Sequence, residues 1–154
     1  GKATSTNQIS VVVRCRDLTT LTPVAQPRFL KTGYGASGAT YYDWQGYDVH
    51  KDRLYYTEGQ SNYNLTGSFY SGSSYAYVTV FDFEGKIVEE RTQVAVVSDK
   101  DKLTEIGVSV FGALEAEGIK VYKGKLYLGY TARGITAENT KHYQNIFVFD
   151  PSSK

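Results

Sequence analysis

Four carboxylates near the starts of two similar segments are the residues best suited to acid–base chemistry. Asp43 and Asp48 flank an aromatic stretch, and Glu115 and Glu117 stand at the corresponding place in a later segment. Two carboxyl groups that face a common channel can serve as the acid and base of a glycosidase or can bind a cation. The candidate catalytic set is therefore Asp48 with Glu115 or Glu117. The alternative is structural: such carboxylates accept hydrogen bonds from backbone amides at strand ends and fix neighbouring sheets together.

Other reactive side chains are few. We expect His50 and His142 to be solvated surface residues, and Cys15 to be a small hydrophobe within a valine-rich strand. A single cysteine allows no intrachain disulfide, and the histidine and cysteine pattern of a zinc site is absent from the sequence. Serine-hydrolase, phosphate-loop and zinc-protease motifs are also absent. The sequence predicts no metal, no cofactor, and an enzyme only through the carboxylates.

Aromatic and short polar side chains crowd the region between residues 34 and 75. Flat aromatic faces beside hydroxyl and amide groups suit sugar rings, which present apolar C–H faces and equatorial hydroxyls. The same mixture suits protein recognition surfaces. Many of these tyrosines must pack between sheets, so the members in loops carry most of the binding prediction. The predicted ligand-binding residues are Tyr41, Tyr42, Trp44, Asn62, Tyr63, Phe69 and Tyr70.

Composition favours an all-β protein. The chain has 154 residues, of which 14% are aromatic and 15 are glycine, as is typical of strands joined by tight turns. A net charge of +1 gives no electrostatic signature for nucleic acid. We find no apolar run long enough for a membrane span and no signal peptide at the amino end. The absence of methionine and the start at Gly1 lead us to expect a processed or excised piece.

The chain nearly repeats itself, and this repeat predicts the elements that position the side chains above. Residues 45–57, Gln-Gly-Tyr-Asp-Val-His-Lys-Asp-Arg-Leu-Tyr-Tyr-Thr, return 72 positions later as Glu-Gly-Ile-Lys-Val-Tyr-Lys-Gly-Lys-Leu-Tyr-Leu-Gly. Residues 77–82, Tyr-Val-Thr-Val-Phe-Asp, return 68 positions later as Asn-Ile-Phe-Val-Phe-Asp. A repeat of that length made of short β segments predicts propeller blades or stacked sheets.

Four strands per unit, A to D, account for the chain as a single all-β unit. We expect a partial blade over residues 9–26, a full four-stranded antiparallel blade over 44–96 and a partial blade over 116–150. Residues 27–40 and 59–74 are predicted loops, and Asp99, Leu103 and Ile106 indicate one short capped helical turn before Gly107. A propeller needs at least about four blades, so the sequence predicts a missing propeller half or a homo-oligomer. The alternative is a β-sandwich whose hairpins merely look alike.

A family resemblance follows from the second copy of the repeat. Residues 114–129, Leu-Glu-Ala-Glu-Gly-Ile-Lys-Val-Tyr-Lys-Gly-Lys-Leu-Tyr-Leu-Gly, and residues 145–149, Asn-Ile-Phe-Val-Phe, resemble the carboxy-terminal part of helveticin J-type bacteriocins. The block Tyr-Asp-Trp-Gln-Gly-Tyr-Asp at residues 42–48 is similar to the preceding repeat of that family. The resemblance implies a secreted antibacterial protein of lactobacilli that acts on related Gram-positive cells. Such proteins are about twice as long as this chain, and the family supplies no catalytic residues to carry over.

Two functional hypotheses result. The preferred one is a secreted or cell-surface, bacteriocin-like protein that binds cell-surface glycans or a receptor of related Gram-positive bacteria without catalysis. The alternative is a cell-wall glycosidase that uses the channel-lining carboxylates.

Overall fold

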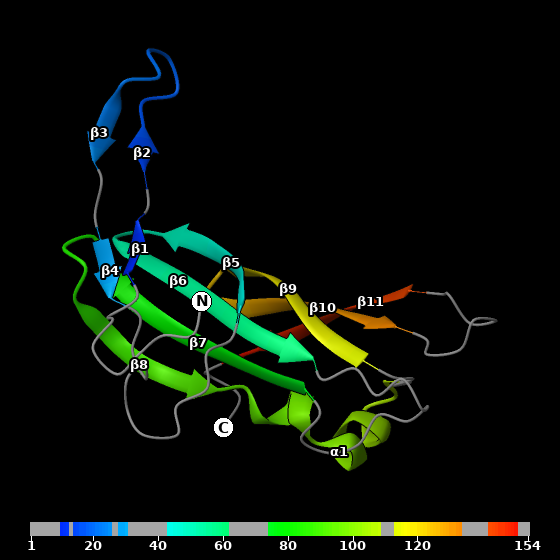
Figure 1. Ribbon diagram of the computed structural model, residues 1–154. Helices are drawn as coiled ribbons and strands as arrows, with labels where there is room; N and C mark the ends of the chain where they lie inside the picture. Colours follow the sequence, from blue (N-terminus) through cyan, green and yellow to red (C-terminus); the bar gives the residue numbers. More distant parts are fainter. Residues whose placement is uncertain are drawn as a thin grey trace.

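The computed structural model describes residues 10–12, 14–25, 28–30, 43–61, 74–108, 113–133 and 142–150. These residues are mostly β-strand, which confirms the all-β prediction. Two antiparallel sheets dominate, and Figure 1 shows the first in cyan to green and the second in yellow to red. None of the helices in the described ranges is long and apolar enough to cross a membrane.

The first sheet is a four-stranded meander. Its strands are β5 (Asp43–His50), β6 (Arg53–Ser61), β7 (Ser74–Asp82) and β8 (Ile87–Gln93), paired in chain order. The two-residue turn at 51–52 has a positive φ of 54° at Lys51. Gly85, with a φ of 86°, allows the turn between β7 and β8, where Asp82 Oδ1 accepts hydrogen bonds from the backbone amides of Glu84 and Lys86.

The second sheet is a three-stranded meander. It contains β9 (Ala113–Tyr122), β10 (Lys125–Arg133) and β11 (His142–Phe149), with β10 in the centre. A two-residue turn at Lys123 and Gly124 joins β9 to β10, with φ values of 48° and 76°. A two-residue hairpin turn with positive φ at both central residues matches the right-handed twist of the flanking strands. Glycine adopts positive φ without steric cost.

The near-repeat in the sequence is a repeat in the backbone. Strand β10 begins and ends 72 residues after β6, and β11 begins 68 residues after β7. Each sheet also has a β-bulge at the same repeat position: the pairing skips Gln45 in β5 and Glu117 in β9. Side chains alternate between the two faces of a sheet. Because a bulge inserts one residue into this alternation, each later side chain in the strand lies on the opposite face from the one it would otherwise occupy. The repeated sequence therefore specifies the same bulged three-stranded unit twice.

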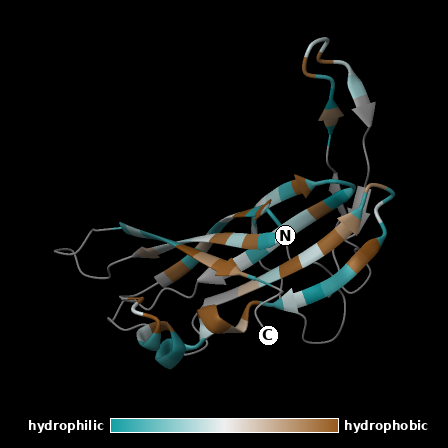
Figure 2. Ribbon diagram, turned by 180° about the vertical axis from the view of Figure 1, so that it is seen from behind, coloured by the Kyte–Doolittle hydropathy of each residue, from teal (hydrophilic) through white to brown (hydrophobic). Residues whose placement is uncertain are grey.

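The two sheets meet where the bulges lie. A Cβ added to Gly46 would stand 3.1 Å from Gly118 Cα, so the backbones of β5 and β9 approach closely at this pair. Strand β9 also contacts β6 and β7. Hydrophobic and hydrophilic residues alternate along the strands of both sheets (Figure 2). Burial removes the apolar set from water and stabilises the pair of sheets. The two sheets and the segment that connects them share one buried core, made of Ala76, Val94, Val97, Leu103, Leu114, Ala116, Leu128, Tyr130 and Ala132.

The chain between the sheets forms the predicted helical turn. Strand β8 ends at Gln93 instead of the expected residue 96, because a 3₁₀ turn (Ala95–Ser98) follows and buries Val97. The side chain of Asp99 then caps α1 (Lys100–Glu105) by accepting hydrogen bonds from the amides of residues 101 and 102. Gly107, with a φ of 79°, ends the turn. The predicted capped turn is confirmed.

The amino-terminal region is a longer pairing than expected. Strand β1 (Ser10–Val12) pairs with β4 (Arg28–Leu30), and β2 (Cys15–Arg16) pairs with β3 (Pro23–Ala25) in a hairpin that projects from the sheets (Figure 1). The prediction of a loop from residue 27 is wrong at Arg28–Leu30, which forms β4. In the antiparallel register between these strands, Val11 is paired with Phe29.

Candidate binding groove

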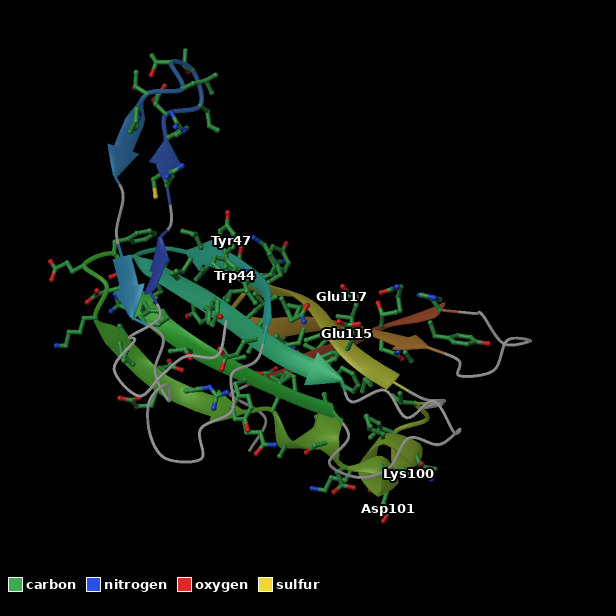
Figure 3. The ribbon with its side chains drawn as sticks, viewed as in Figure 1. Trp44, Tyr47, Lys100, Asp101, Glu115 and Glu117 are labelled. Atoms are coloured by element: carbon green, nitrogen blue, oxygen red, sulfur yellow. The ribbon has the colours of Figure 1, made fainter. Side chains whose placement is uncertain are left out.

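Only one predicted aromatic binding residue can be placed. Trp44 lies on β5 with its side chain 37% exposed, and its ring meets those of Tyr47 and Tyr56 edge to face at 5.6 and 5.2 Å (Figure 3). The structure thus places Trp44 in an aromatic cluster on the face away from the second sheet. Six predicted residues lie outside the described ranges: Tyr41, Tyr42, Asn62, Tyr63, Phe69 and Tyr70.

Asp48 joins the two sheets. One carboxylate oxygen accepts a hydrogen bond from the backbone amide of Val121 at 2.8 Å, and the other accepts one from Lys120 Nζ at 2.9 Å. The Val121 amide lies on the edge of β9 that faces β5, away from its partner β10. This is the structural alternative anticipated for the repeated carboxylates, and it occupies both oxygens of Asp48.

The other two candidate carboxylates lie further along β9. Glu117 is the exposed bulge residue and Glu115 is partly buried (Figure 3). They lie four and six residues from Val121, or about 13 and 20 Å at about 3.3 Å per residue. The carboxyl groups of a glycosidase stand about 5 to 9.5 Å apart. The structure does not bring Asp48 together with either glutamate.

The remaining reactive side chains are dispersed. His142 is exposed at the start of β11, and His50 and Cys15 are partly buried. Within the described part of the chain, no group of three or more histidine, cysteine, aspartate or glutamate side chains is placed to hold a metal ion.

A groove of about 590 Å³ lies between the sheets, and sequence reasoning missed it. One wall is formed by the first sheet. There Val80 of β7 pairs with Tyr55 of β6 on one side and with Glu89 of β8 on the other. The other wall is formed by the second sheet, in which Leu126 of β10 pairs with Val121 of β9 and with Phe149 of β11. We call this space the inter-sheet groove, and the residues that line its two walls and its rim are Tyr55, Glu89, Val121, Gly124, Lys125, Leu126, Val148, Phe149 and Asp150.

The two walls differ in chemistry. The first sheet presents a phenol and a carboxylate, whereas the facing row of the second sheet is entirely apolar. A smaller space of about 270 Å³ shares Glu89, Leu126 and Phe149 and extends the same opening past the end of β8. The groove is therefore amphipathic across its width.

Charge is unevenly balanced in this groove. At the rim, Lys125 Nζ and an Asp150 oxygen form an ion pair at 2.8 Å, and their hydrogen bond raises the pKa of Lys125. Burial, with a smaller contribution from the Glu89 carboxylate, raises the pKa of Tyr55, so its hydroxyl remains a hydrogen-bond donor at neutral pH. Lys125 and Asp150 neutralise one another, and Glu89 leaves the groove with a net negative charge.

This arrangement suits binding better than catalysis. A carboxylate accepts hydrogen bonds, a phenol donates and accepts them, and the apolar wall with Phe149 offers a surface to C–H groups. The sequence carried one usable signal, the repeat itself, because it places Tyr55 of β6 in the same register as Tyr127 of β10. The facing of the two rows depends on how the sheets pack, and the repeat spacing does not contain that information.

Comparisons of the chain with protein-family models, with curated proteins and with solved structures found no match.

Proposed function

We propose that this chain is a non-enzymatic carbohydrate-binding unit of a bacteriocin-like antibacterial protein, and that the inter-sheet groove holds a sugar ring. The amphipathic groove is the observation that carries this proposal. A pyranose ring has an apolar C–H face and a rim of hydroxyl groups. The Val121, Leu126 and Phe149 wall fits the ring face, while Glu89 and Tyr55 fit the hydroxyls.

Charge narrows the class of sugar. Glu89 has no cation opposite it among the groove residues, because Lys125 is paired with Asp150. The Glu89 carboxylate would repel an anionic sugar, because like charges at short range are unfavourable. The groove is therefore expected to select neutral or amino sugars, which occur in bacterial cell walls, over uronic acids and sugar phosphates.

The bacteriocin-like setting, secretion or surface location, and related Gram-positive target cells are proposed from the resemblance at residues 114–129 and 145–149. We infer in addition that the two sheets are successive blades of a propeller-type fold. The inner strands β5 and β9 touch at Gly46 and Gly118, and the groove lies between β6 and β8 of the first sheet and the three strands of the second. The close contact of the inner strands beside this opening supports the blade interpretation over the sandwich.

A titration of cell-wall glycan fragments tests the groove. Isothermal calorimetry with Glu89→Gln should show at least about tenfold weaker binding than the unmodified chain, because a charge-assisted hydrogen bond to a hydroxyl is lost. Glu90→Gln is the matched control, since Glu90 is the next residue on β8 and is also exposed but does not line the groove. Equal affinities for the two variants would exclude the groove as the sugar site.

A second pair separates recognition from general effects on the fold. Tyr55→Phe removes the groove hydroxyl and should weaken binding by a few fold, whereas Tyr127→Phe changes the repeat-equivalent tyrosine that does not line the groove. Incubation with purified peptidoglycan should release no reducing sugar at any pH. Release that is lost in Glu117→Gln would replace the binding proposal with the glycosidase alternative.

A further inference from the structure

A second space opens off one end of the inter-sheet groove, beside the end of β8. Its volume is about 270 Å³, many times the roughly 15 Å³ that a cavity needs to hold one water molecule, so it has room for part of a ligand. It shares Glu89, Leu126 and Phe149 with the groove. We call it the side space, and the residues that line it but not the groove are Val78, Thr92, Gln93, Val94, Ala95 and Leu128.

An irregularity in strand pairing places two polar residues of β8 at this opening. Val80 of β7 pairs with Glu89, whereas Val78 pairs with Thr92, so a step of two residues along β7 corresponds to a step of three along β8. Val78 and Val80 share one face of the sheet because side chains alternate along a strand, and paired residues lie on the same face. Glu89 and Thr92 therefore both point toward the second sheet, where Leu126 lines the opposite wall.

Glu89 and Thr92 both accept hydrogen bonds at this opening. The Glu89 carboxylate has no proton to donate. The Thr92 hydroxyl already donates to the backbone carbonyl oxygen of Glu90 at 2.9 Å, which leaves only its lone pairs. Gln93 pairs with Tyr77, so its side chain points to the opposite face of the sheet. A ligand group that lies between the groove and the side space must therefore supply an N–H or an O–H.

The interior of the side space is apolar. Leu128 and Val94 are 1% and 9% exposed and belong to the packed core, and Val78 packs against that core. A polar group placed there without a partner costs free energy, whereas a methyl group gains free energy from burial. The side space thus fits the apolar end of a group whose hydrogen-bond donor lies at Glu89.

We propose that the sugar bound in the inter-sheet groove is an N-acylated amino sugar, with its amide N–H donating to Glu89 and its acyl methyl group in the side space. This inference rests on the proposed function, and it narrows the neutral and amino sugars to one class. In a trans amide the carbonyl oxygen points away from the N–H. The oxygen therefore lies away from the Glu89 carboxylate, and the two acceptors do not face each other.

Other substituents at the same ring position match only part of this arrangement. A hydroxyl group can donate to Glu89, but it leaves the side space without an apolar group. A free ammonium group attracts the carboxylate, but it must give up water beside Leu126 and Phe149 and also leaves the side space unfilled. Of these three substituents, the acylamino group alone combines a donor with an adjacent apolar end.

Calorimetric titration of the full chain with four β-1,4-linked trimers tests the proposal. A glucosamine trimer is used as the free amine, N-acetylated and N-propionylated, and a glucose trimer carries hydroxyl groups instead. The N-acetylated trimer should bind at least about tenfold more tightly than the glucose trimer, as expected for one methyl group in an apolar pocket. The N-propionylated trimer should bind at least as tightly as the N-acetylated one, because the side space has room for a further methylene group.

The outcomes separate this inference from the proposed function. Binding of the glucose or free-amine trimer as tightly as the N-acylated forms would overturn the inference and leave the groove as a sugar site. Absence of binding by all four trimers would also overturn the inference, and the titration of cell-wall fragments with Glu89→Gln then decides the proposed function separately.

Ala95→Leu tests where the acyl group lies. Ala95 is exposed and lines the side space but not the groove, so the larger side chain fills the side space and leaves the groove intact. The variant should lose the roughly tenfold preference for the N-acetylated trimer, while its affinity for the glucose trimer stays the same. Val88→Leu, which enlarges an exposed residue beside Glu89 that lines neither space, should keep the preference. An unchanged preference in Ala95→Leu would contradict the placement of the acyl group.

Discussion

The two sheets share one backbone arrangement but bury different side chains at equivalent positions, as residues 58 and 130 show. Glu58 on β6 is 1% exposed, forms an ion pair with Arg91 of β8, and accepts a hydrogen bond from the Tyr56 hydroxyl at 3.4 Å. Tyr130, the repeat equivalent on β10, is also 1% exposed, but its hydroxyl has no hydrogen-bond partner among the described residues. Its ring packs edge to face on Phe147 at 5.2 Å.

The fourth strand accounts for this difference. Strand β8 supplies Arg91, whose guanidinium carbon also lies 3.6 Å from the centre of the Tyr77 ring. In the described part of the second sheet, β11 is the outermost strand and brings no such cation. A buried carboxylate needs a nearby opposite charge, whereas an aromatic ring does not. The repeat thus specifies the backbone. Whether a charged or an aromatic side chain is buried at the equivalent position depends on the outer strand.

The largest effect is expected from the buried ion pair of the first sheet. Arg91→Met leaves the Glu58 carboxylate buried without its guanidinium and should lower the free energy of unfolding by about 3 to 5 kcal/mol. Urea unfolding measures this change. The double variant Arg91→Met with Glu58→Leu should recover most of the loss. A single variant that matches the unmodified chain would show that the ion pair does not distinguish the two sheets.

The glycine pair should respond asymmetrically. Gly46→Ala places a methyl group 3.1 Å from Gly118 Cα and should cost about 1 to 3 kcal/mol by overpacking. Gly118→Ala points into open space and should change the free energy of unfolding by less than about 0.5 kcal/mol. Urea unfolding of the two variants measures both changes. Equal costs would contradict the packing of β5 on β9.

Loss of the Asp48 contact between the two sheets is expected to lower the free energy of unfolding by a smaller amount. Asp48→Ala removes the acceptor of the Val121 amide and should cost about 1 to 2 kcal/mol in urea unfolding. Lys120→Ala removes only the ion-pair partner, whose side chain is 64% exposed, and should cost at most about 0.5 kcal/mol. If the lysine variant lost as much as the aspartate variant, the backbone hydrogen bond would not be the contact that matters.

The smallest effect concerns Tyr130 and depends on pH. Burial raises the pKa of Tyr130 above its usual range, so the folded state favours the neutral form of this side chain. This contribution to stability is present below the unfolded pKa of about 10 and is lost as pH rises above it. Tyr130→Phe should gain about 1 kcal/mol at neutral pH and unfold at a higher alkaline pH. Tyr122→Phe, at an exposed position, should leave the alkaline midpoint unchanged.

Local chemistry made much of the fold predictable. The Asp99 cap lies where the sequence predicts it, and the positive φ at Lys123, Gly124 and Gly85 likewise follows from short-range preferences. The all-β class follows from alternation and the repeat. Strand β4 was missed because its three residues, Arg28–Leu30, carry no signal without their partner strand.

The groove required information that no local pattern contains. Glu89 reaches it only because Tyr55, Val80 and Glu89 align across three strands, and because this row faces Leu126. The register between β7 and β8 shifts on both sides of Val80 and so sets that alignment, and such an irregularity inserts a residue without an obligatory sequence mark. The role of Asp48 was foreseen as one of two alternatives, but which atoms it contacts depends on how the sheets pack.

The central claim is that the repeated units stack through their bulged inner strands. A nuclear Overhauser spectrum of the labelled chain at low concentration tests it directly, because Gly46 points at Gly118 Cα. A cross-peak between the α-protons of Gly46 and those of Gly118 is the predicted result. Its absence, with both glycines assigned and the strand pairings of β5 with β6 and β9 with β10 intact, would contradict the stacking.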